Sequence, residues 1–293
     1  MLFGKIKLNV GASSIWRKDG WLVIDHKLVK STKDAIAADA VNIDLPDNSC
    51  AVIFCSHVFE HIPHYNLPLV VAEINRILVP GGIFRILTPD LETLCKAYVD
   101  KDVEFFRKAK QEDESLRTDL GFGGMLMNFI VSPGQDTVLL DRKIKEFIGG
   151  YAHIYSYDYQ MLSTILTKLG FDCQRSCFKG SSIEEMREPL HVEGLPTEWQ
   201  NLNQEFFKKN NLVHRLIDGK YEINFKLTGF DRDPLTSLII EAKKQFYVKK
   251  DSANIIFNES MDNYNRYGRS LLSYAEITQR LKSCGIKFQA KEA

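Results

Sequence analysis

The chain has 293 residues, enough to bury a large hydrophobic core, and is 44% hydrophobic and 26% charged. These proportions are typical of a globular protein and exclude a largely disordered chain. Lysine plus arginine (38) balance aspartate plus glutamate (38), so the formal net charge is zero. Such a balance gives no electrostatic reason for nonspecific binding to nucleic acid or to an anionic membrane, and we expect a small-molecule partner instead.

The cysteines and the hydropathy pattern indicate the cellular compartment of the protein. None of the six cysteines belongs to a CxxC pair, so we interpret them as reduced thiols. The sequence shows no basic and apolar leader, and no run approaches the roughly 18 apolar residues of a membrane helix. We therefore expect a cytoplasmic protein that does not insert into membranes.

Short apolar runs alternate with helical or turn segments, which predicts an α/β domain on a mostly parallel sheet. The predicted strands are Lys5–Val10, Trp21–Ile24, Ala35–Ala38, Ala51–Cys55, Ile83–Leu87, Phe171–Phe178 and Leu235–Ala242.

Apolar residues at three- and four-residue spacing predict helices. One spans residues 67–78 and is stopped by the Pro-Gly-Gly sequence that follows. A second spans Tyr157–Leu169, with Ser156 as its expected N-cap and Gly170 just past its end. A third pattern, at Ser270–Leu281, predicts a helix near the C-terminus.

The spacing of the strands predicts one domain over residues 1–243 and a helical extension over 244–293. Two long insertions, 92–150 and 179–233, interrupt the domain. Connections this long are usually functional covers or small subdomains. The first insertion contains the glycine-flanked apolar sequence GFGGMLMNF, which predicts either a mobile lid or a helical packing subdomain.

Four predicted strands are followed by a small or acidic residue, namely Gly11, Asp25, Asp39 and Ser56. Ligands of open α/β sheets bind beyond these carboxyl ends. A carboxylate such as Asp25 can accept hydrogen bonds from both ribose hydroxyls, and Asp39, with the backbone N–H of Ala40, can hold an adenine ring. The first turn, GASS, lacks the GxGxxG sequence that seats a pyrophosphate, so a nucleoside without phosphates is favoured over NAD.

Five segments resemble a known family: LNVGASS (8–14), GWLVID (20–25), ADA (38–40), DNSCAVIFCSHVFEHI (47–62) and EINRILVPGGIFRILTPDL (73–91). In this order they resemble the class I S-adenosylmethionine (SAM) dependent methyltransferases, and among them the type 11 methyltransferase-domain proteins often associated with cell-surface glycan biosynthesis. The resemblance implies a Rossmann-like, doubly wound sheet of seven mostly parallel strands with one antiparallel strand. It also implies SAM as cofactor, S-adenosylhomocysteine as product, and a hydroxyl of a small-molecule or sugar-type acceptor.

By the same resemblance, Gly11 lines the methionine and ribose portion of SAM, Asp25 holds the ribose and Asp39 holds the adenine. The full expected cofactor-binding set is Asn9, Val10, Gly11, Ala12, Ser13, Asp25, His26, Asp39, Ala40, Ser56 and His57. Two features depart from the family pattern. Ser13 stands where many relatives have a second glycine, and the first connection is a loop rather than a helix.

His57, Glu60 and His61 also match HxxEH, in which two histidines bind zinc and the glutamate is the base of a peptidase. That chemistry requires one continuous helix, but a predicted strand ends directly before the motif and Pro63 follows it. We therefore expect no metal site and interpret Glu60 and His61 as hydrogen-bonding loop residues. We rank a zinc peptidase last of three functional hypotheses, and the other two follow from the histidines considered next.

Methylation of a hydroxyl requires removal of a proton, and histidine is the usual base near neutral pH. The candidates are His57 and His153, with Asp90 to orient either ring. A packing or hydrogen-bonding role is the alternative for each histidine. The leading hypothesis is a SAM-dependent methyltransferase, and the second is a noncatalytic relative that binds SAM or a partner protein.

Overall fold

The computed structural model describes residues 6–12, 16, 18–109, 121–131, 153–177, 180–186, 213–215, 221–223, 230–231, 233, 235–249, 252–253, 255–256 and 258. Among these residues, no helix is long and apolar enough to cross a membrane.

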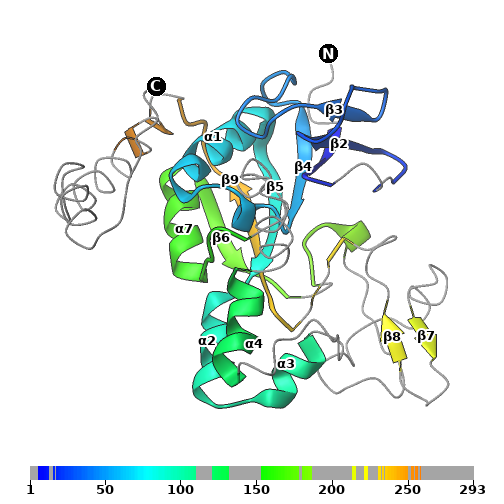
Figure 1. Cartoon of the computed structure of the whole chain (residues 1–293). Coiled ribbons are helices and arrows are strands. Elements are labelled where there is room, and N and C mark those ends of the chain that lie inside the picture. The colour runs from blue at the N-terminus through cyan, green and yellow to red at the C-terminus, as the bar shows by residue number, and fades with distance from the viewer. Residues whose placement is uncertain are drawn as a thin grey trace, which may run out of the picture.

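The centre of the structure is a seven-stranded sheet of order β3-β2-β1-β4-β5-β9-β6 (Figure 1). Its strands are β1 (Ile6–Val10), β2 (Trp21–Asp25), β3 (Ala35–Ala37), β4 (Cys50–Ser56), β5 (Leu78–Pro89), β6 (Phe171–Arg175) and β9 (Ser237–Lys244). β9 runs antiparallel to both β5 and β6, and the other neighbours are parallel. The predicted Rossmann-like fold is therefore confirmed, and the strand order reverses between β1 and β4, where such sheets bind ligands.

Both faces of the sheet are covered, which explains why its strands are nearly continuous apolar runs. On one face, helices α1 (Leu67–Ile77) and α7 (Tyr159–Lys168) share a core with the strands, and Figure 1 shows both helices on the same side. On the other face, Met186 of the short helix η4 (Glu184–Met186) packs with Phe230 against Phe54 and the neighbouring strands.

Three helices form a separate cluster at the carboxyl end of β5, and Figure 1 shows them together at one end of the sheet. They are α2 (Leu91–Val99), α3 (Val103–Ala109) and α4 (Gly121–Ile130). Leu94, Phe106 and Phe129 are buried at their centre. The described part of the 92–150 insertion is thus helical, while its role as a lid stays a prediction.

The second insertion includes two paired antiparallel strands, β7 (Val213–Arg215) and β8 (Tyr221–Ile223), which are not among the predicted strands. β9 runs one residue past the predicted domain boundary at 243. The division at that boundary stays a prediction, and the predicted helix at 270–281 lies outside the described residues.

Several element ends differ from their predictions. β5 begins at Leu78 rather than at Ile83, so the Pro-Gly-Gly sequence lies within the strand, α7 begins at Tyr159 and β9 begins at Ser237. Asp158, not Ser156, caps α7, because its carboxylate accepts a hydrogen bond from the Met161 N–H at 2.8 Å. β6 ends at Arg175 rather than at Phe178, because the chain turns there and Cys177 forms an antiparallel bridge with Gly180.

Candidate functional site

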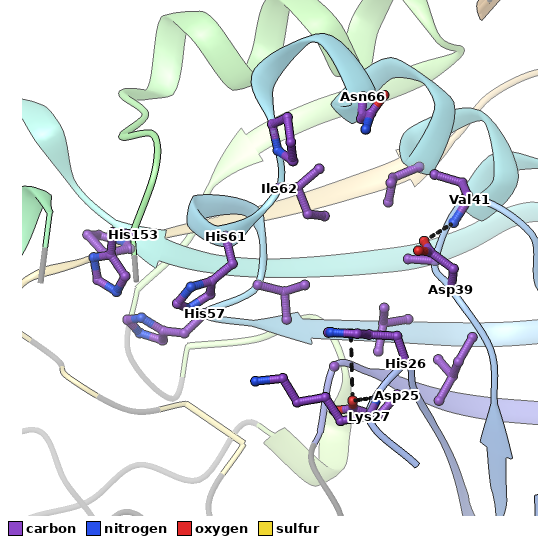
Figure 2. A pocket seen from close by; sticks show the side chains of 18 of the residues that line it. Asp25, His26, Lys27, Asp39, Val41, His57, His61, Ile62, Asn66 and His153 are labelled. Carbon is purple, nitrogen blue, oxygen red and sulfur yellow. Dashed lines mark hydrogen bonds and ion pairs between the residues drawn. The ribbon is translucent and has the colours of Figure 1, made fainter. Parts of the chain in front are cut away.

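A cavity of about 640 Å³ lies at the carboxyl edge of the sheet, beside the point where the strand order reverses. Val10 at the end of β1 and His57 directly after β4 both line it. The volume is in the range of sites that bind small molecules and cofactors. Figure 2 shows two groups of polar side chains in this cavity, an acidic end around Asp25 and Asp39 and a histidine end.

The acidic end is held by hydrogen bonds to the backbone. Asp25 is the last residue of β2, and its Oδ1 accepts from the Lys27 N–H at 2.8 Å. Asp39 follows β3, and its Oδ1 accepts from the Val41 N–H at 3.1 Å. The two carboxylates therefore have fixed orientations at the ends of neighbouring strands, as expected from their positions in the sequence.

Gly11 occupies a place that no other residue fits without strain. Its φ of +72° is in the left-handed region, and an added Cβ would lie 2.3 Å from Cγ2 of Val58. Both residues line the cavity. The glycine therefore lets the end of β1 approach the segment that follows β4.

The histidine end combines two segments that are far apart in the sequence. His57 and His61 belong to the segment after β4, which contains the short helix η1 (Phe59–His61), and His153 precedes α7. The backbone carbonyl of Glu60 accepts from the N–H groups of Ile154 at 2.8 Å and Tyr155 at 3.2 Å. These bonds fix the position of His153 relative to η1.

Glu60 lies at the centre of this cluster, and its side chain is completely buried. Its Oε1 is 2.9 Å from Nδ1 of His57 and 4.0 Å from Nε2 of His153, and the Thr88 hydroxyl donates to Oε2 at 3.2 Å. Burial raises the pKa of Glu60, but the charge and hydrogen bond of His57 and the charges of the other two histidines outweigh it and lower the pKa to about 2. Glu60 is therefore ionised near neutral pH.

His57 adopts an unusual backbone conformation, with a φ of +53°. Such left-handed non-glycine residues are enriched at functional sites. The His57 N–H donates to the Leu87 carbonyl at 2.8 Å, which holds the conformation. The ring Nε2 is 3.1 Å from the Ser237 hydroxyl and 3.4 Å from Asp233 Oδ2. The ring is thus fixed on both sides, by Glu60 and by the start of β9.

His153 is oriented by the helical cluster. Its Nδ1 lies 2.8 Å from the carbonyl oxygen of Phe129 in α4. A carbonyl can only accept, so Nδ1 carries the proton of the neutral ring and Nε2 carries the lone pair. Burial lowers the pKa of His153 to about 4 against the opposing effect of Glu60. The ring is neutral near pH 7.

Most of the predicted cofactor-binding residues line the cavity: Val10, Gly11, Asp25, His26, Asp39, Ala40 and His57. Asn9, Ala12 and Ser56 do not. Alternation along β1 and β4 turns Asn9 and Ser56 to the face opposite to that of Val10. Ser13 lies outside the described residues.

Asp90 does not orient a histidine as expected. It is the N-cap of α2, where it accepts from the Glu92 N–H at 3.2 Å and the Thr93 hydroxyl at 3.0 Å. The carboxylate beside His57 is that of Glu60. The HxxEH match had singled out Glu60, although for a different chemistry.

The structure does not support the zinc peptidase. Only residues 59–61 form the helix η1, and His57 precedes it in a left-handed conformation, so the HxxEH residues do not share one helix.

Sequence reasoning missed Phe129 of α4 and Asp233, which precedes β9, although both line the cavity. They are 72 and 176 positions from His57 in the chain, and no motif marks them.

Residues 21–86 match the family model of a methyltransferase domain. The matched segment runs from β2 into β5 and contains Asp25, Asp39, His57 and Glu60. The match supports the predicted methyltransferase. No curated protein matches the sequence.

Solved structures described as methyltransferases are similar over most of the chain. A putative S-adenosylmethionine dependent methyltransferase from Listeria monocytogenes is 14% identical, with 84% of this chain and 93% of that chain covered and a TM-score of 0.39. A SAM dependent methyltransferase from Archaeoglobus fulgidus is 16% identical, with 83% and 87% covered and a TM-score of 0.36. Because these TM-scores are low, the fold assignment rests on the strand order of this chain.

Proposed function

We propose that the protein is a SAM-dependent methyltransferase that methylates a hydroxyl group of a small-molecule or sugar-type acceptor. One observation carries the proposal. A single cavity holds two oriented carboxylates at one end and, at the other, a histidine backed by a buried carboxylate. The first group suits a nucleoside and the second suits removal of a proton. The methyltransferase-domain match supports the reaction class, and the sugar-type acceptor rests on the sequence resemblance.

The side chains at the acidic end fit an adenosine group. Asp25 would accept hydrogen bonds from the ribose hydroxyls, and Asp39 would accept from the adenine amino group. The adjoining apolar residues Ile24 and Val41 also line the cavity and suit the faces of a purine ring. SAM, when bound, supplies a methyl group on a sulfonium that leaves as a neutral thioether.

The histidine end would remove the acceptor proton. The acceptor hydroxyl would take the place of the Ser237 hydroxyl, which lies 3.1 Å from Nε2 of His57. As the new O–CH₃ bond forms and the S–CH₃ bond breaks, the hydroxyl proton passes to this Nε2. Glu60 holds the opposite ring nitrogen at 2.9 Å and stabilises the imidazolium that results. His153 is the weaker candidate base, because burial lowers its pKa to about 4.

The helical cluster would cover the acceptor. Ala109 of α3 and Phe129 of α4 line the cavity, so α3 and α4 form part of its wall. Exclusion of water at this wall favours transfer of the methyl group to the acceptor over side reactions.

Isothermal titration with SAM and S-adenosylhomocysteine tests the cofactor assignment. We expect the wild-type protein to bind both, and Asp25→Asn to weaken binding by at least about tenfold. Asp19→Asn is the matched control, because Asp19 is an exposed turn residue outside the cavity wall. A folded wild-type protein that binds neither compound would overturn the proposal.

Transfer is tested separately with methyl-labelled SAM and a panel of sugars and small alcohols. We expect a labelled product that His57→Ala reduces by about 100-fold or more, the usual contribution of a general base. Binding of SAM without transfer to any hydroxyl acceptor would instead favour the noncatalytic alternative.

A further inference from the structure

We propose that Glu60, His61 and His153 bind one divalent transition-metal ion at the histidine end of the cavity. Each residue offers a ligand atom, and these atoms all lie within 4.8 Å of one another. Two imidazoles and one carboxylate form a ligand set that suits Zn²⁺ and related first-row ions. The set differs from the HxxEH pattern, because the fold replaces His57 with His153 from a distant segment.

The two segments that carry the ligands are already joined. Glu60 and His61 are adjacent in η1, and the Glu60 carbonyl binds the N–H groups of Ile154 and Tyr155, directly after His153. The rings of His61 and His153 meet edge to face, with centroids 5.0 Å apart. The two segments are therefore already in contact, and binding an ion would require movement of the side chains rather than ordering of a loop.

His153 presents the correct nitrogen. Because Nδ1 donates to the Phe129 carbonyl at 2.8 Å, Nε2 carries the lone pair, and it faces Glu60 Oε1 at 4.0 Å. Metal-binding histidines almost always donate their other N–H to a backbone carbonyl or a carboxylate. In a tetrahedral site, an ion about 2.0–2.1 Å from each atom would bring the two to roughly 3.3 Å apart, so binding requires these side chains to approach by less than about 1 Å.

The two oxygens of the Glu60 carboxylate differ in their surroundings. The Thr88 hydroxyl donates to Oε2, whereas Oε1 is buried without a hydrogen-bond partner among the described residues, with Nδ1 of His57 2.9 Å away. A buried carboxylate oxygen that lacks a hydrogen bond has lone pairs available for an ion. In this arrangement His57 is a positioning residue for the metal site.

The position of the site indicates its use. His61 and His153 both line the cavity, so an ion held by them has open coordination positions toward the acceptor. A bound divalent ion lowers the pKa of a coordinated hydroxyl and would ease transfer of its proton to His57. This role of the ion in activating the acceptor rests on the proposed methyltransferase function. The binding of the ion itself does not depend on that function.

The test is titration of chelator-treated protein with Zn²⁺, followed by Co²⁺ substitution and visible absorption spectroscopy. We expect one ion per chain and Co²⁺ bands typical of nitrogen and oxygen ligands. Glu60→Gln, His61→Asn and His153→Asn should each weaken Zn²⁺ binding by at least about tenfold. His26→Asn is the control, because His26 lines the acidic end of the same cavity and its side chain is 52% exposed.

Circular dichroism establishes that each variant is folded, and His61→Asn keeps the test valid if the buried Glu60→Gln fails to fold. Failure of the wild-type protein to bind Zn²⁺, or binding that survives both histidine substitutions, would overturn the site. If the wild-type protein binds SAM but not Zn²⁺, the metal site alone is overturned. If it binds Zn²⁺ but not SAM, the proposed function alone is overturned.

Discussion

The carboxylate of Glu60 lies 2.9 Å from Nδ1 of His57 with no exposure to solvent. A buried charge is costly unless neighbouring groups compensate it. Here the imidazole and the Thr88 hydroxyl, which donates to the other oxygen, supply the compensation. The same contacts that orient His57 toward the cavity therefore also contribute to the stability of the fold.

Replacing Glu60 by glutamine should lower the free energy of unfolding by about 1–3 kcal/mol, because a buried network loses its charged acceptor. Glu92→Gln is the matched control. Glu92 is exposed and pairs with Arg175 at 2.7 Å, and such surface pairs contribute at most about 1 kcal/mol. Urea unfolding of the chelator-treated proteins measures both effects. Equal effects would show that Glu60 is not a compensated buried charge.

Gly11→Ala should destabilise the protein through both backbone strain and a steric clash. Gly20→Ala isolates the strain, because Gly20 has a similar φ of +80° but nothing within 4 Å of an added Cβ. We expect a loss of about 1–2 kcal/mol for Gly20→Ala and a further 1–3 kcal/mol or so for Gly11→Ala, where the Cβ meets Val58.

A double-mutant cycle in thermal unfolding identifies the clash. Val58→Ala should recover part of the loss in the Gly11→Ala background, whereas in the wild-type background it should only destabilise. Absence of this coupling would show that the tight approach of Gly11 to Val58 is not what requires the glycine.

Arg85→Met should cost about 3–5 kcal/mol, because it removes the guanidinium that two buried carboxylates share. Arg85 lies in β5 with no exposure, and it pairs with Asp231 and with Glu241, the latter at 2.8 Å. Arg107→Met is the control, since its ion pair is exposed. Chemical denaturation should show an effect of less than about 1 kcal/mol for the control. Similar small losses for both would contradict a structural role for the Arg85 network.

The acidic end of the site could be predicted because its signals are local. Asp25 ends one short apolar strand and Asp39 comes after the next, and parallel strands bring their carboxyl ends to one edge of the sheet. The sheet itself was predictable for the same reason, because each strand is an apolar run between turn residues.

The histidine end could be predicted only in part. His57 and Glu60 stand in one motif, but the contact of Glu60 with His153 depends on how the segment before α7 packs on η1. The position of Asp90 directly before a helix suits an N-cap as well as a partner for histidine, and in the structure its carboxylate caps α2. Asp233 reaches His57 only because β9 inserts between β5 and β6, an order that no periodicity in the sequence encodes.

His64 should make the stability of the protein depend on pH. Its ring stacks on Tyr155 at 4.4 Å between centroids, and burial lowers its pKa from the usual 6.5. Below pH 6.5 or so the unfolded chain therefore binds more protons at this position than the folded protein does. The contribution of His64 is fully present above that pH and is lost as the pH falls toward the lowered folded-state pKa.

His64→Phe keeps an aromatic ring on Tyr155 but removes the titration. Urea unfolding between about pH 7 and pH 5 should thus show a steeper loss of stability in the wild-type protein than in this variant. His64→Gln should show the same shallow pH dependence but lower stability at pH 7, because it also loses the stacked ring. If all three proteins lose stability in parallel as the pH falls, the proton uptake occurs elsewhere and His64 is not the group responsible.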